Sequence, residues 1–397
     1  MEPQSALRTI QDVAEFTHEI GARPKIHYTT FTIPKRSGGI RTIHSPAGPL
    51  ASVQRRIANL LTALYSAPGS THGFAPKRSI ITNALSHCGS THFLNLDIRD
   101  CFPSISEQMV AQGLATIGAD SAVIDRILRI CMRNGSLPQG SPTSPILLNL
   151  ALSEFDRELS QFASANGAVV SRYADDITIS TASKMPSTIA VPIRAPFRVL
   201  VGRELSSIFA NARLAVNFRK LRLEETSTRA PLVTGIHVAP RLDVRRRVWR
   251  RTEAMFRMLR TFGAEQCEAS HAQRFGGTFH SVLAGLVEFI SSVVGPGDVR
   301  MRKLLDPSDQ RTEADFWSSR LAGMQARTPK LREMAPRPGE TVFFRDSDGG
   351  VQVGVTARAD RQLQINAPKP PLPTSIVIDA RGHALGRGSD FRLAPSS

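Results

Sequence analysis

Three aspartates beside apolar, strand-like segments constrain the fold of this chain more than any other feature. Asp97 ends the apolar run FLNLD, while Asp175 and Asp176 lie inside RYADDITIS, between two arms that suit β-strands. Acidic residues are poor strand formers, and carboxylates buried near one another are costly unless a cation or hydrogen-bond donors compensate. The pattern therefore indicates a rigid mount for divalent cations. Taken alone, it would equally fit a cap at Asp97 and an ordinary hairpin turn at the Asp-Asp pair.

Magnesium is the cation that such a site favours, with Mn²⁺ as a substitute. Mg²⁺ takes oxygen ligands and is usually held by one or two carboxylates together with substrate phosphates. In a two-metal site, one ion activates the attacking hydroxyl and the other stabilises the leaving oxygen. The four cysteines, Cys88, Cys101, Cys131 and Cys267, form no CxxC pair and have no paired histidines nearby. The sequence therefore predicts neither a zinc site nor a disulfide framework.

Positive charge points to a nucleic-acid partner. The chain has 50 Lys and Arg residues against 34 Asp and Glu residues, a formal net charge of +16. Binding to phosphates releases condensed counterions, so such an excess favours a polyanion, although better solubility alone would also explain it. No apolar run approaches the ~20 residues that span a bilayer, and the first residues lack the apolar block of a signal peptide. We therefore expect a cytoplasmic protein with no membrane partner.

Residue periodicity predicts an α+β chain. Alternating β-branched residues predict hairpins at 28–45 and 168–181, the second with Ala174 and Asp175 near its tip, and a strand at 92–98. Apolar residues at helical spacing predict the helices. The remaining predicted elements are helices at about 50–66, 105–117, 120–133, 145–163, 198–213 and 244–300, short strands at 214–223 and 231–239, and an inserted proline-rich loop at 184–197.

Three segments resemble the catalytic motifs of reverse transcriptases, in the order typical of that family. They are LDIRDCFPSI at 96–105, LPQGSPTSPILLNL at 137–150 and YADD at Tyr173–Asp176. Upstream, IPKRSGGIRTI at 33–43 and HGFAPKRSI at 72–80 resemble the fingers segments of these enzymes. The resemblance extends over roughly three quarters of the chain and implies an RNA-directed DNA polymerase, a nucleotidyltransferase.

The resemblance also implies an α+β right-hand polymerase fold with fingers, a palm built on an antiparallel sheet, and a helical thumb. An N-terminal helix and linker would occupy 1–25, fingers and palm 26–243, and the thumb 244–304. From 305 to 397, proline, glycine and isolated strand-like runs predict a small β-rich or partly disordered C-terminal extension of unknown role.

Carried over position by position, the family implies how metals and protons would be handled. Asp97, Asp175 and Asp176 would hold two Mg²⁺ ions, helped by the backbone carbonyl of Ile98. Lys220, in NFRKLRL, lies where the family often places a lysine that protonates departing pyrophosphate. The alternative for Lys220 is a plain surface lysine.

Five further residues match positions that contact the incoming dNTP. Lys35 and Arg41 would grip the triphosphate, because Arg offers a planar fork and Lys a mobile point charge; the alternative is an exposed basic hairpin. Gln139 and Gly140 would lie under the nucleotide, since glycine allows close backbone approach. Phe102 matches the steric gate that excludes a ribose 2′-hydroxyl, and the alternative is a core phenylalanine. This residue and the alanine of YADD disfavour an RNA-dependent RNA polymerase.

Two short elements resemble those of retron reverse transcriptases, NALSH at Asn83–His87 and VTG at Val233–Gly235. Retron membership implies a structured noncoding RNA as template and primer, a cDNA branched from a guanosine 2′-hydroxyl (msDNA), and antiphage defence with a separate effector protein. Asn83 and His87 are then candidate RNA-binding residues, although local hydrogen bonding would also explain them. The basic start of the predicted thumb would recognise RNA by its fold, through Arg245, Arg246, Arg247 and Arg250.

Other readings stay open. The chain could be another bacterial reverse transcriptase, of the group II intron, diversity-generating or abortive-infection type, or an RNA-binding module without activity. The intact aspartates argue against a silent module, and the tail has neither a maturase-like basic segment nor zinc-type cysteines. The sequence also departs from the retron pattern at Cys101, where many members have a second aromatic residue, and at 184–197, which is longer than usual.

Overall fold

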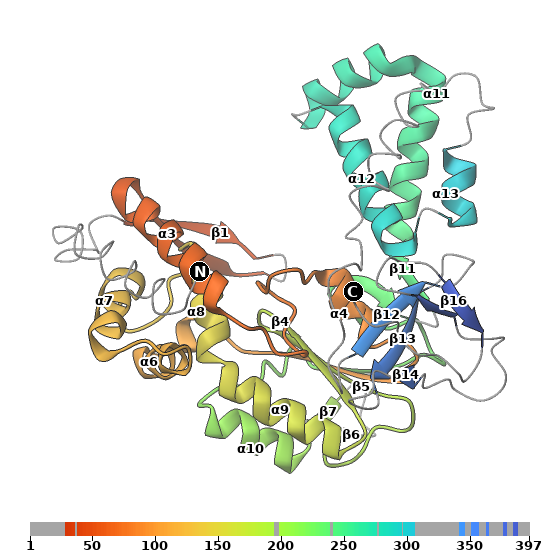
Figure 1. The fold of residues 1–397 in the computed structure, drawn as a ribbon. Coiled ribbons are helices and arrows are strands. Elements are labelled where there is room, and N and C mark those ends of the chain that lie inside the picture. The colour runs from red at the N-terminus through yellow and green to blue at the C-terminus, as the bar shows by residue number, and fades with distance from the viewer. Residues whose placement is uncertain are drawn as a thin grey trace. The chain divides into compact units, whose positions relative to one another are not determined.

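The computed structural model describes residues 28–35, 38–193, 198–238, 241–275, 278–295 and 297–305, together with short strands between 341 and 387. The chain divides into two compact units (Figure 1). The first draws its described residues from Met1–Ser79 and His92–Glu224, and the second from Ile80–Thr91 and Glu225–Ser397. The helix and linker predicted at 1–25, and most of the predicted C-terminal extension, lie outside the described residues. The predicted domain boundaries stay predictions.

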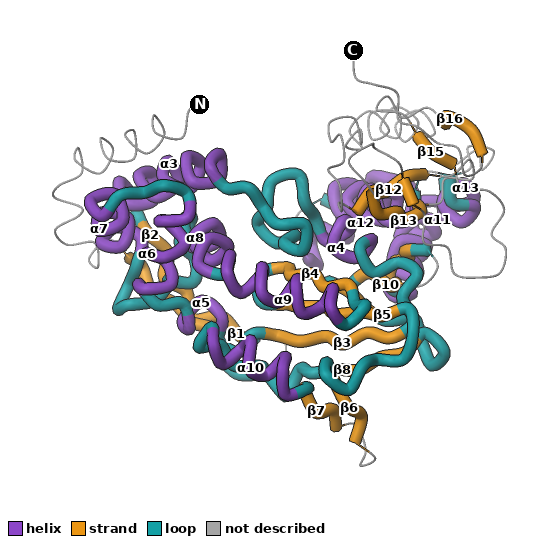
Figure 2. The backbone as a smooth tube through the Cα atoms, turned by 60° about the horizontal axis from the view of Figure 1, so that its bottom comes forward, coloured by secondary structure: helices purple, strands orange, loops and turns teal. Residues whose placement is uncertain are grey.

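A four-stranded sheet in the order β4-β5-β3-β8 organises the first unit (Figure 2). β4 (Val169–Tyr173) and β5 (Asp176–Thr181) form an antiparallel hairpin, and β3 (His92–Asp97) pairs antiparallel with all of β5. β8 (Arg222–Glu225) lies on the other side of β3. The strand and the hairpin that the sequence predicts here are confirmed.

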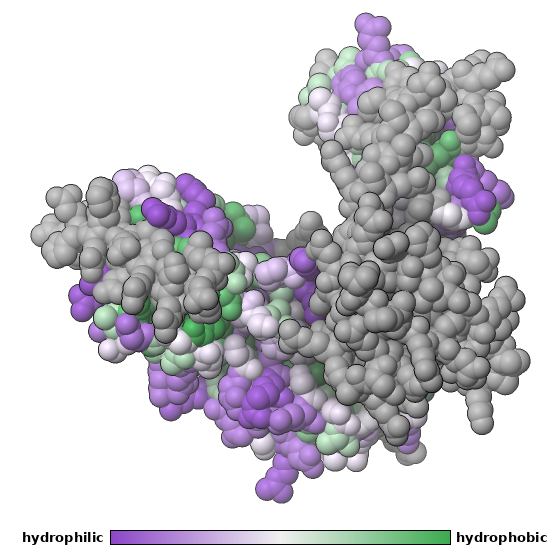
Figure 3. Space-filling view, viewed as in Figure 1, coloured by the Kyte–Doolittle hydropathy of each residue, from purple (hydrophilic) through white to green (hydrophobic). Residues whose placement is uncertain are grey.

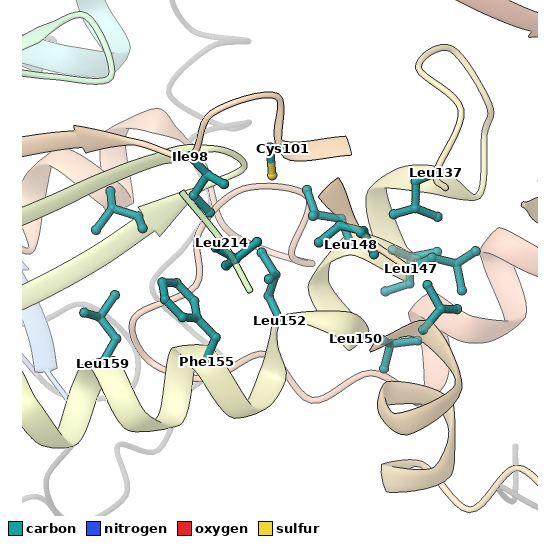
Figure 4. Close-up of a cluster of buried hydrophobic side chains, with 14 of the residues drawn as sticks. Ile98, Cys101, Leu137, Leu147, Leu148, Leu150, Leu152, Phe155, Leu159 and Leu214 are labelled. Atoms are coloured by element: carbon teal, nitrogen blue, oxygen red, sulfur yellow. The ribbon is translucent and has the colours of Figure 1, made fainter. Parts of the chain in front are cut away.

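Amphipathic helices pack with this sheet around one hydrophobic core. Phe155 in α9 (Ser153–Ala165) and Phe209 in α10 (Arg203–Asn211) pack edge to face, with ring centroids 5.1 Å apart. Figure 4 shows Phe155 pointing toward Leu214 inside the core, and Figure 3 shows a largely hydrophilic outer surface over the same two helices. The helices of this unit are α3 (Gly48–Leu64), α5 (Cys101–Ser104), α6 (Glu107–Thr116), α7 (Ser121–Cys131), α8 (Ser144–Ala151), α9 (Ser153–Ala165) and α10 (Arg203–Asn211).

An N-terminal hairpin lies against the loop that precedes α8. β1 (Tyr28–Pro34) and β2 (Ile40–Pro46) pair antiparallel, as the sequence predicts. The backbone N–H of His44 donates to the carbonyl of Gln139 at 2.7 Å. Gly140 has a φ of +109°, and a Cβ there would lie 2.8 Å from the Ile43 side chain, so glycine is needed for this close approach.

A buried ion pair joins α9 to β4. Arg172 donates to both carboxylate oxygens of Asp156, at 2.6 and 2.5 Å, and both side chains are 1% exposed. Thr71 donates to the same carboxylate at 2.8 Å, and the Asn149 side-chain carbonyl accepts from Arg172 at 3.1 Å. Burying two charges is costly, and these additional hydrogen bonds offset part of that cost.

The second unit combines a small sheet with long helices. Its antiparallel sheet contains β9 (Leu232–Val233), β10 (Ile236–Val238) and β11 (Leu242–Val244), and α4 (Ile80–Leu85) contacts β9 and β10. The helices predicted for 244–300 are present as α11 (Arg246–Phe275), which is broken at Gly263 (φ +76°), α12 (Phe279–Val294) and α13 (Val299–Leu304).

Further along, the described strands agree with a β-rich C-terminal extension. They form one three-stranded and one two-stranded sheet. They are β12 (Thr341–Arg345), β13 (Val351–Thr356), β14 (Leu363–Gln364), β15 (Ile376–Ile378) and β16 (Ala384–Arg387).

The loop predicted at 184–197 contains a short hairpin instead. β6 (Ala190–Ile193) pairs antiparallel with β7 (Arg198–Val201), and the helix expected from about 198 begins only at Arg203. Prolines are tolerated in such isolated two-stranded pairs, because edge positions need no ladder donor. The prolines therefore led to the prediction of a loop, although the Val and Ile residues of this stretch favour strands.

Within the described ranges, none of the helices combines the length and the apolar character needed to cross a bilayer. The expected cytoplasmic location stays a prediction.

Asp156→Asn is expected to lower the free energy of unfolding by about 3–5 kcal/mol, because it leaves the buried Arg172 guanidinium without its counter-charge. Urea denaturation followed by circular dichroism measures the loss. The matched control is Glu154→Gln, in an exposed ion pair with Arg157, where we expect a change under about 1 kcal/mol. Equal effects of the two substitutions would contradict a structural role for the buried pair.

Candidate active site

The three aspartates meet at one end of the four-stranded sheet. Asp97 is the last residue of β3 and lies directly opposite Asp176, the first residue of β5. Asp175 occupies the turn between β4 and β5, and its carbonyl accepts a hydrogen bond from the Ile98 backbone N–H at 2.9 Å. Like charges that face each other on neighbouring strands repel. The fold therefore brings together the predicted acids and needs other groups to hold them there.

The turn that carries Asp175 is supported from beneath. Ala174 has a φ of +59°, a conformation that costs a residue with a side chain roughly 1–3 kcal/mol. The Arg172 guanidinium donates to the Ala174 carbonyl at 3.0 Å. A Cβ at Gly73 would lie 2.2 Å from the Ala174 nitrogen, so only glycine fits there, and Asn149 donates to the Gly73 carbonyl at 2.9 Å. The buried ion-pair network thus also holds the acidic turn.

Two donors bind the Asp97 carboxylate. Lys220 Nζ lies 2.5 Å from Oδ2, and Asn217 Nδ2 donates to Oδ1 at 2.9 Å. The Asn217 backbone N–H also donates to the Asp97 carbonyl at 2.8 Å. Asp97 is 5% exposed whereas Lys220 is 47% exposed, so the lysine reaches the buried carboxylate from the solvent side.

Burial and neighbouring charges raise the pKa values of Asp175 and Asp176. Burial, followed by the Asp97 charge, raises the pKa of Asp175, against the lowering effects of Lys220 and Arg41. For Asp176, desolvation by the surrounding protein, then the charges of Asp175 and Asp97, raises the pKa to about 6, although solvent still reaches the side chain. Burial lowers the pKa of Lys220, but the hydrogen bond and charge of Asp97 outweigh it, so the net shift is upward.

This excess of negative charge fits a divalent cation. The candidate ligand atoms are all carboxylate or carbonyl oxygens, which Mg²⁺ prefers. A bound cation would lower the raised pKa values of Asp175 and Asp176. Among the described residues, His, Cys, Asp and Glu side chains do not form a preassembled cluster of three or more metal ligands. Mg²⁺ usually takes one or two carboxylates and completes its shell with water and substrate phosphates. Asp97, Asp175 and Asp176, with the Ile98 carbonyl, therefore stay the candidate metal ligands.

The predicted triphosphate residues share one cavity in the first unit. Lys35, Arg41 and Gln139 line a cavity of about 250 Å³ between the β1–β2 hairpin, the start of α5 and the loop after α7. The Arg41 charge lowers the pKa of Asp175, so Arg41 lies within electrostatic reach of the acidic turn. Gly140, next to Gln139, is exposed at the close approach to β2.

The predicted steric gate lies beside this cavity. Phe102 is in α5, half-buried, and packs partly against the hydrophobic core. Asp100 and Pro103, on either side of it in the chain, line the cavity. Its position is thus compatible with both alternatives, a gate and a core residue.

Asn83 and His87, the predicted RNA-binding residues of the NALSH element, are both buried. Asn83 is 2% exposed and His87 is 0% exposed. Asn83 Nδ2 donates to the Thr234 hydroxyl at 3.3 Å, and this hydroxyl donates to the Ile80 carbonyl at 3.2 Å. Burial also lowers the pKa of His87 to about 3, so the ring is neutral. Asn83 thus joins the NALSH element to the VTG element, and the predicted RNA-binding role of Asn83 and His87 stays a prediction.

The arginines at the start of α11 remain candidates for RNA contact. Arg246, Arg247 and Arg250 are exposed, whereas Arg245 is half-buried. Exposed positive charge on one helix suits a phosphate backbone. Their role in RNA binding stays a prediction.

Several residues of this site were not predicted from the sequence. Asn217 and Asp156 carry no motif signal, because polar residues are common after strands and within helices. Arg172 had one usable signal, since a long cation inside a strand that leads to two acids needs a buried partner.

Asp176→Asn is expected to stabilise the metal-free protein at neutral pH. Because the folded pKa of Asp176 is about 6 against an ordinary 3.8, its stabilising contribution is full below about pH 4 and is lost as the pH rises through about 6. We expect the variant to melt about 1–3 °C above the natural protein at pH 7.5 in EDTA, a small difference because solvent screens an exposed carboxyl. Scanning fluorimetry measures it, and the gap should close near pH 4.

Added Mg²⁺ should then reverse the order at pH 7.5, because it binds the ionised carboxylate and stabilises the natural protein. The Mg²⁺-induced rise in melting temperature should shrink at pH 5, where Asp176 is protonated. An equal rise in both proteins would contradict metal binding by Asp176.

Comparison with known proteins agrees with this geometry. The family described as reverse transcriptase (RNA-dependent DNA polymerase) matches residues 33–233, just over half of the chain. The chain is 37% identical to the Retron Mx65 reverse transcriptase of Myxococcus xanthus over 172 residues, 39% of this chain and 40% of the relative. It is 35% identical to the Retron Mx162 reverse transcriptase of the same bacterium over 231 residues, 53% and 47% of the two chains.

Among solved structures, apo telomerase from Candida tropicalis is similar with a TM-score of 0.43 and 13% identity, covering 75% of this chain and 60% of that one. The chain spans less than half the length of the two curated relatives. The antiparallel sheet, the helical segments and the family match confirm the predicted α+β right-hand polymerase fold. The chain belongs to the reverse transcriptase family, and its curated relatives are of the bacterial retron type.

Proposed function

We propose that this chain is an RNA-directed DNA polymerase that adds deoxynucleotides by two-metal phosphoryl transfer. The observation that carries the proposal is the meeting of Asp97, Asp175 and Asp176 at one sheet end, within electrostatic reach of Arg41 in the cationic cavity. A site that joins clustered carboxylates to basic side chains suits a metal-bound nucleoside triphosphate. No covalent protein intermediate is needed, since positioning and charge stabilisation dominate this chemistry.

The side chains would divide the work of binding and orientation. Bound Mg²⁺ ions would supply the charge that activates the attacking hydroxyl and stabilises the leaving pyrophosphate. Asp97, Asp175 and Asp176 would hold these ions, and Arg41 and Lys35 would orient the triphosphate.

Lys220 would supply a proton. Its raised pKa keeps Nζ charged at neutral pH, and the Lys220 side chain, which reaches Asp97, is 47% exposed. With Mg²⁺ bound by Asp97, the Lys220 ammonium would be available to protonate the departing pyrophosphate.

The substrate contacts would set the choice of sugar. Gln139 and Gly140 would lie under the nucleotide, and Phe102 would exclude a ribose 2′-hydroxyl. The position of Phe102 in α5, next to two cavity residues, supports this role.

We further propose that the chain makes the branched RNA–DNA product of a retron, msDNA. The names of its relatives and the packing of the NALSH against the VTG element support this assignment. A structured noncoding RNA would serve as template and primer, and the exposed arginines of α11 would bind it. By the same resemblance the protein would act in the cytoplasm, in antiphage defence, with a separate effector protein.

The double substitution Asp175→Asn with Asp176→Asn should reduce dNTP incorporation on an RNA template by at least about 10³-fold, because it removes the main source of charge stabilisation. Primer extension measures this, and filter binding should show RNA affinity within about twofold of the natural protein. Asp125→Asn, at an exposed position of α7, is the matched control and should be fully active. Undiminished synthesis by the double variant would remove the site assignment.

Protein purified from its host should carry a short DNA joined 2′–5′ to RNA, if the chain works in a retron. Gel analysis before and after treatment with a debranching enzyme detects this linkage as a change in mobility. The double variant above should carry RNA without the DNA branch. Recovery of only linear nucleic acid would contradict the retron assignment and leave the polymerase proposal standing.

A further inference from the structure

A third cation, Arg133, lines the cavity that contains Lys35 and Arg41. It does not belong to the motifs that suggested the other two. Its backbone is fixed by a tight turn, in which Arg133 and Ser136 exchange backbone hydrogen bonds at 2.9 and 3.2 Å. Asn134 and Gly135, between them, both have positive φ, +52° and +73°, the arrangement that Asn-Gly favours.

The Arg133 side chain is held in place by neutral groups. Its guanidinium carbon lies 5.7 Å from the Tyr28 ring centroid, and Nη1 lies 2.7 Å from Nδ1 of His44. Burial, followed by the Arg133 charge, lowers the pKa of His44, so the ring is neutral at pH 7 and accepts this hydrogen bond. Gln54 donates to the Tyr28 hydroxyl at 2.7 Å and to the Ile130 carbonyl at 2.8 Å, which ties this support to the core.

None of these contacts neutralises the guanidinium. In the described residues that line the cavity, Lys35, Arg41 and Arg133 face a single carboxylate, Asp100. The Nε of Arg133 is buried without a hydrogen-bond partner, and a buried donor without a partner is costly. A site with three cations and one acid is suited to an anion with several charges.

We propose that Arg133 binds the phosphate tail of the incoming nucleoside triphosphate, as a third cationic contact beside Lys35 and Arg41. This inference rests on the proposed polymerase function. A cavity of about 250 Å³ is below the roughly 300–1,000 Å³ of pockets that enclose whole drug-sized ligands, so it suits the phosphates rather than the entire nucleotide. A fork-shaped guanidinium on a rigid turn binds phosphate oxygens in a set orientation.

The position of the cavity in the chain favours a triphosphate over a nucleic-acid backbone. Asp100, three residues after the candidate metal ligand Asp97, lines the cavity, so an anion bound here lies beside the segment that carries this ligand. The triphosphate carries its charges on adjacent phosphates, which three converging cations can bind together. Backbone phosphates carry single charges spaced along a strand, and a cavity of this size would contact few of them.

The test compares Arg133→Gln with Arg129→Gln, which removes the same charge from an exposed position of α7 outside the cavity. Arg133→Gln should weaken binding of inorganic tripolyphosphate, measured by titration calorimetry, by about tenfold or more, as expected for a charge-assisted contact. It should raise KM for dNTP by a similar factor and leave kcat within about twofold. Arg129→Gln should change none of these, and Arg133→Lys should fall between, because it keeps the charge and loses the fork.

Several outcomes separate the alternatives. Unchanged tripolyphosphate binding and KM in a folded Arg133→Gln protein would overturn the proposal. So would a weaker primer–template affinity with an unchanged KM, which would assign Arg133 to the nucleic-acid backbone. If the natural protein incorporates no dNTP but tripolyphosphate binding still depends on Arg133, the anion site stands and the polymerase function fails. If Arg133→Gln does not fold, the comparison of Arg133→Lys with Arg129→Gln decides.

Discussion

Repulsion among three carboxylates is the constraint on which the arrangement of the first unit depends. The antiparallel register of β3 and β5 sets Asp97 against Asp176, and the turn before β5 adds Asp175. These charges would push the strand ends apart if nothing opposed them. The ladder of the sheet holds the backbones, and Lys220 and Asn217 bind the most buried of the three carboxylates. Burial, followed by the charges of neighbouring carboxylates, raises the pKa values of Asp175 and Asp176.

The same buried arginine supports both the core and this acidic turn. Arg172 pairs with Asp156 in the interior and also donates to the Ala174 carbonyl. The close approach of Gly73 leaves no space for the turn to move toward the core. Rigid support of this kind matters for catalysis, because small displacements of positioned groups cost large factors in rate. Stability and site geometry are therefore coupled through one ion pair.

Opposite charges are separated in space around the site. The carboxylates lie at the sheet end, while Lys35, Arg41 and Arg133 line the neighbouring cavity. The carboxylates repel one another, and so do the basic side chains of the cavity. A metal-bound triphosphate would present cations to the acids and anions to the basic side chains, so substrate binding would relieve both. The charges that would bind a metal-bound triphosphate are thus already in place in the unliganded fold. Phosphoryl transfer depends on such preorganisation.

Local pattern was enough to predict the elements, since strand alternation and helical spacing depend on neighbours in the chain. It predicted β3, the β4–β5 hairpin and the helical segments other than α4 and α5, and motif order predicted which acids belong together. It failed at the strands Ala190–Ile193 and Arg198–Val201, because the prolines of this stretch favoured a loop. The burial of Asn83 and His87 depends on packing between distant segments, which the local pattern does not show.

The sequence by itself was enough to predict the candidate metal ligands and the triphosphate residues, because they lie in short motifs that resemble those of reverse transcriptases. Only the tertiary structure decided what supports and completes them: Asn217 beside Asp97, Asp156 beneath the turn, and Arg133 in the cavity. These contacts join residues far apart in the chain. Their energies depend on burial and side-chain orientation, which cannot be predicted from the pattern of neighbouring residues.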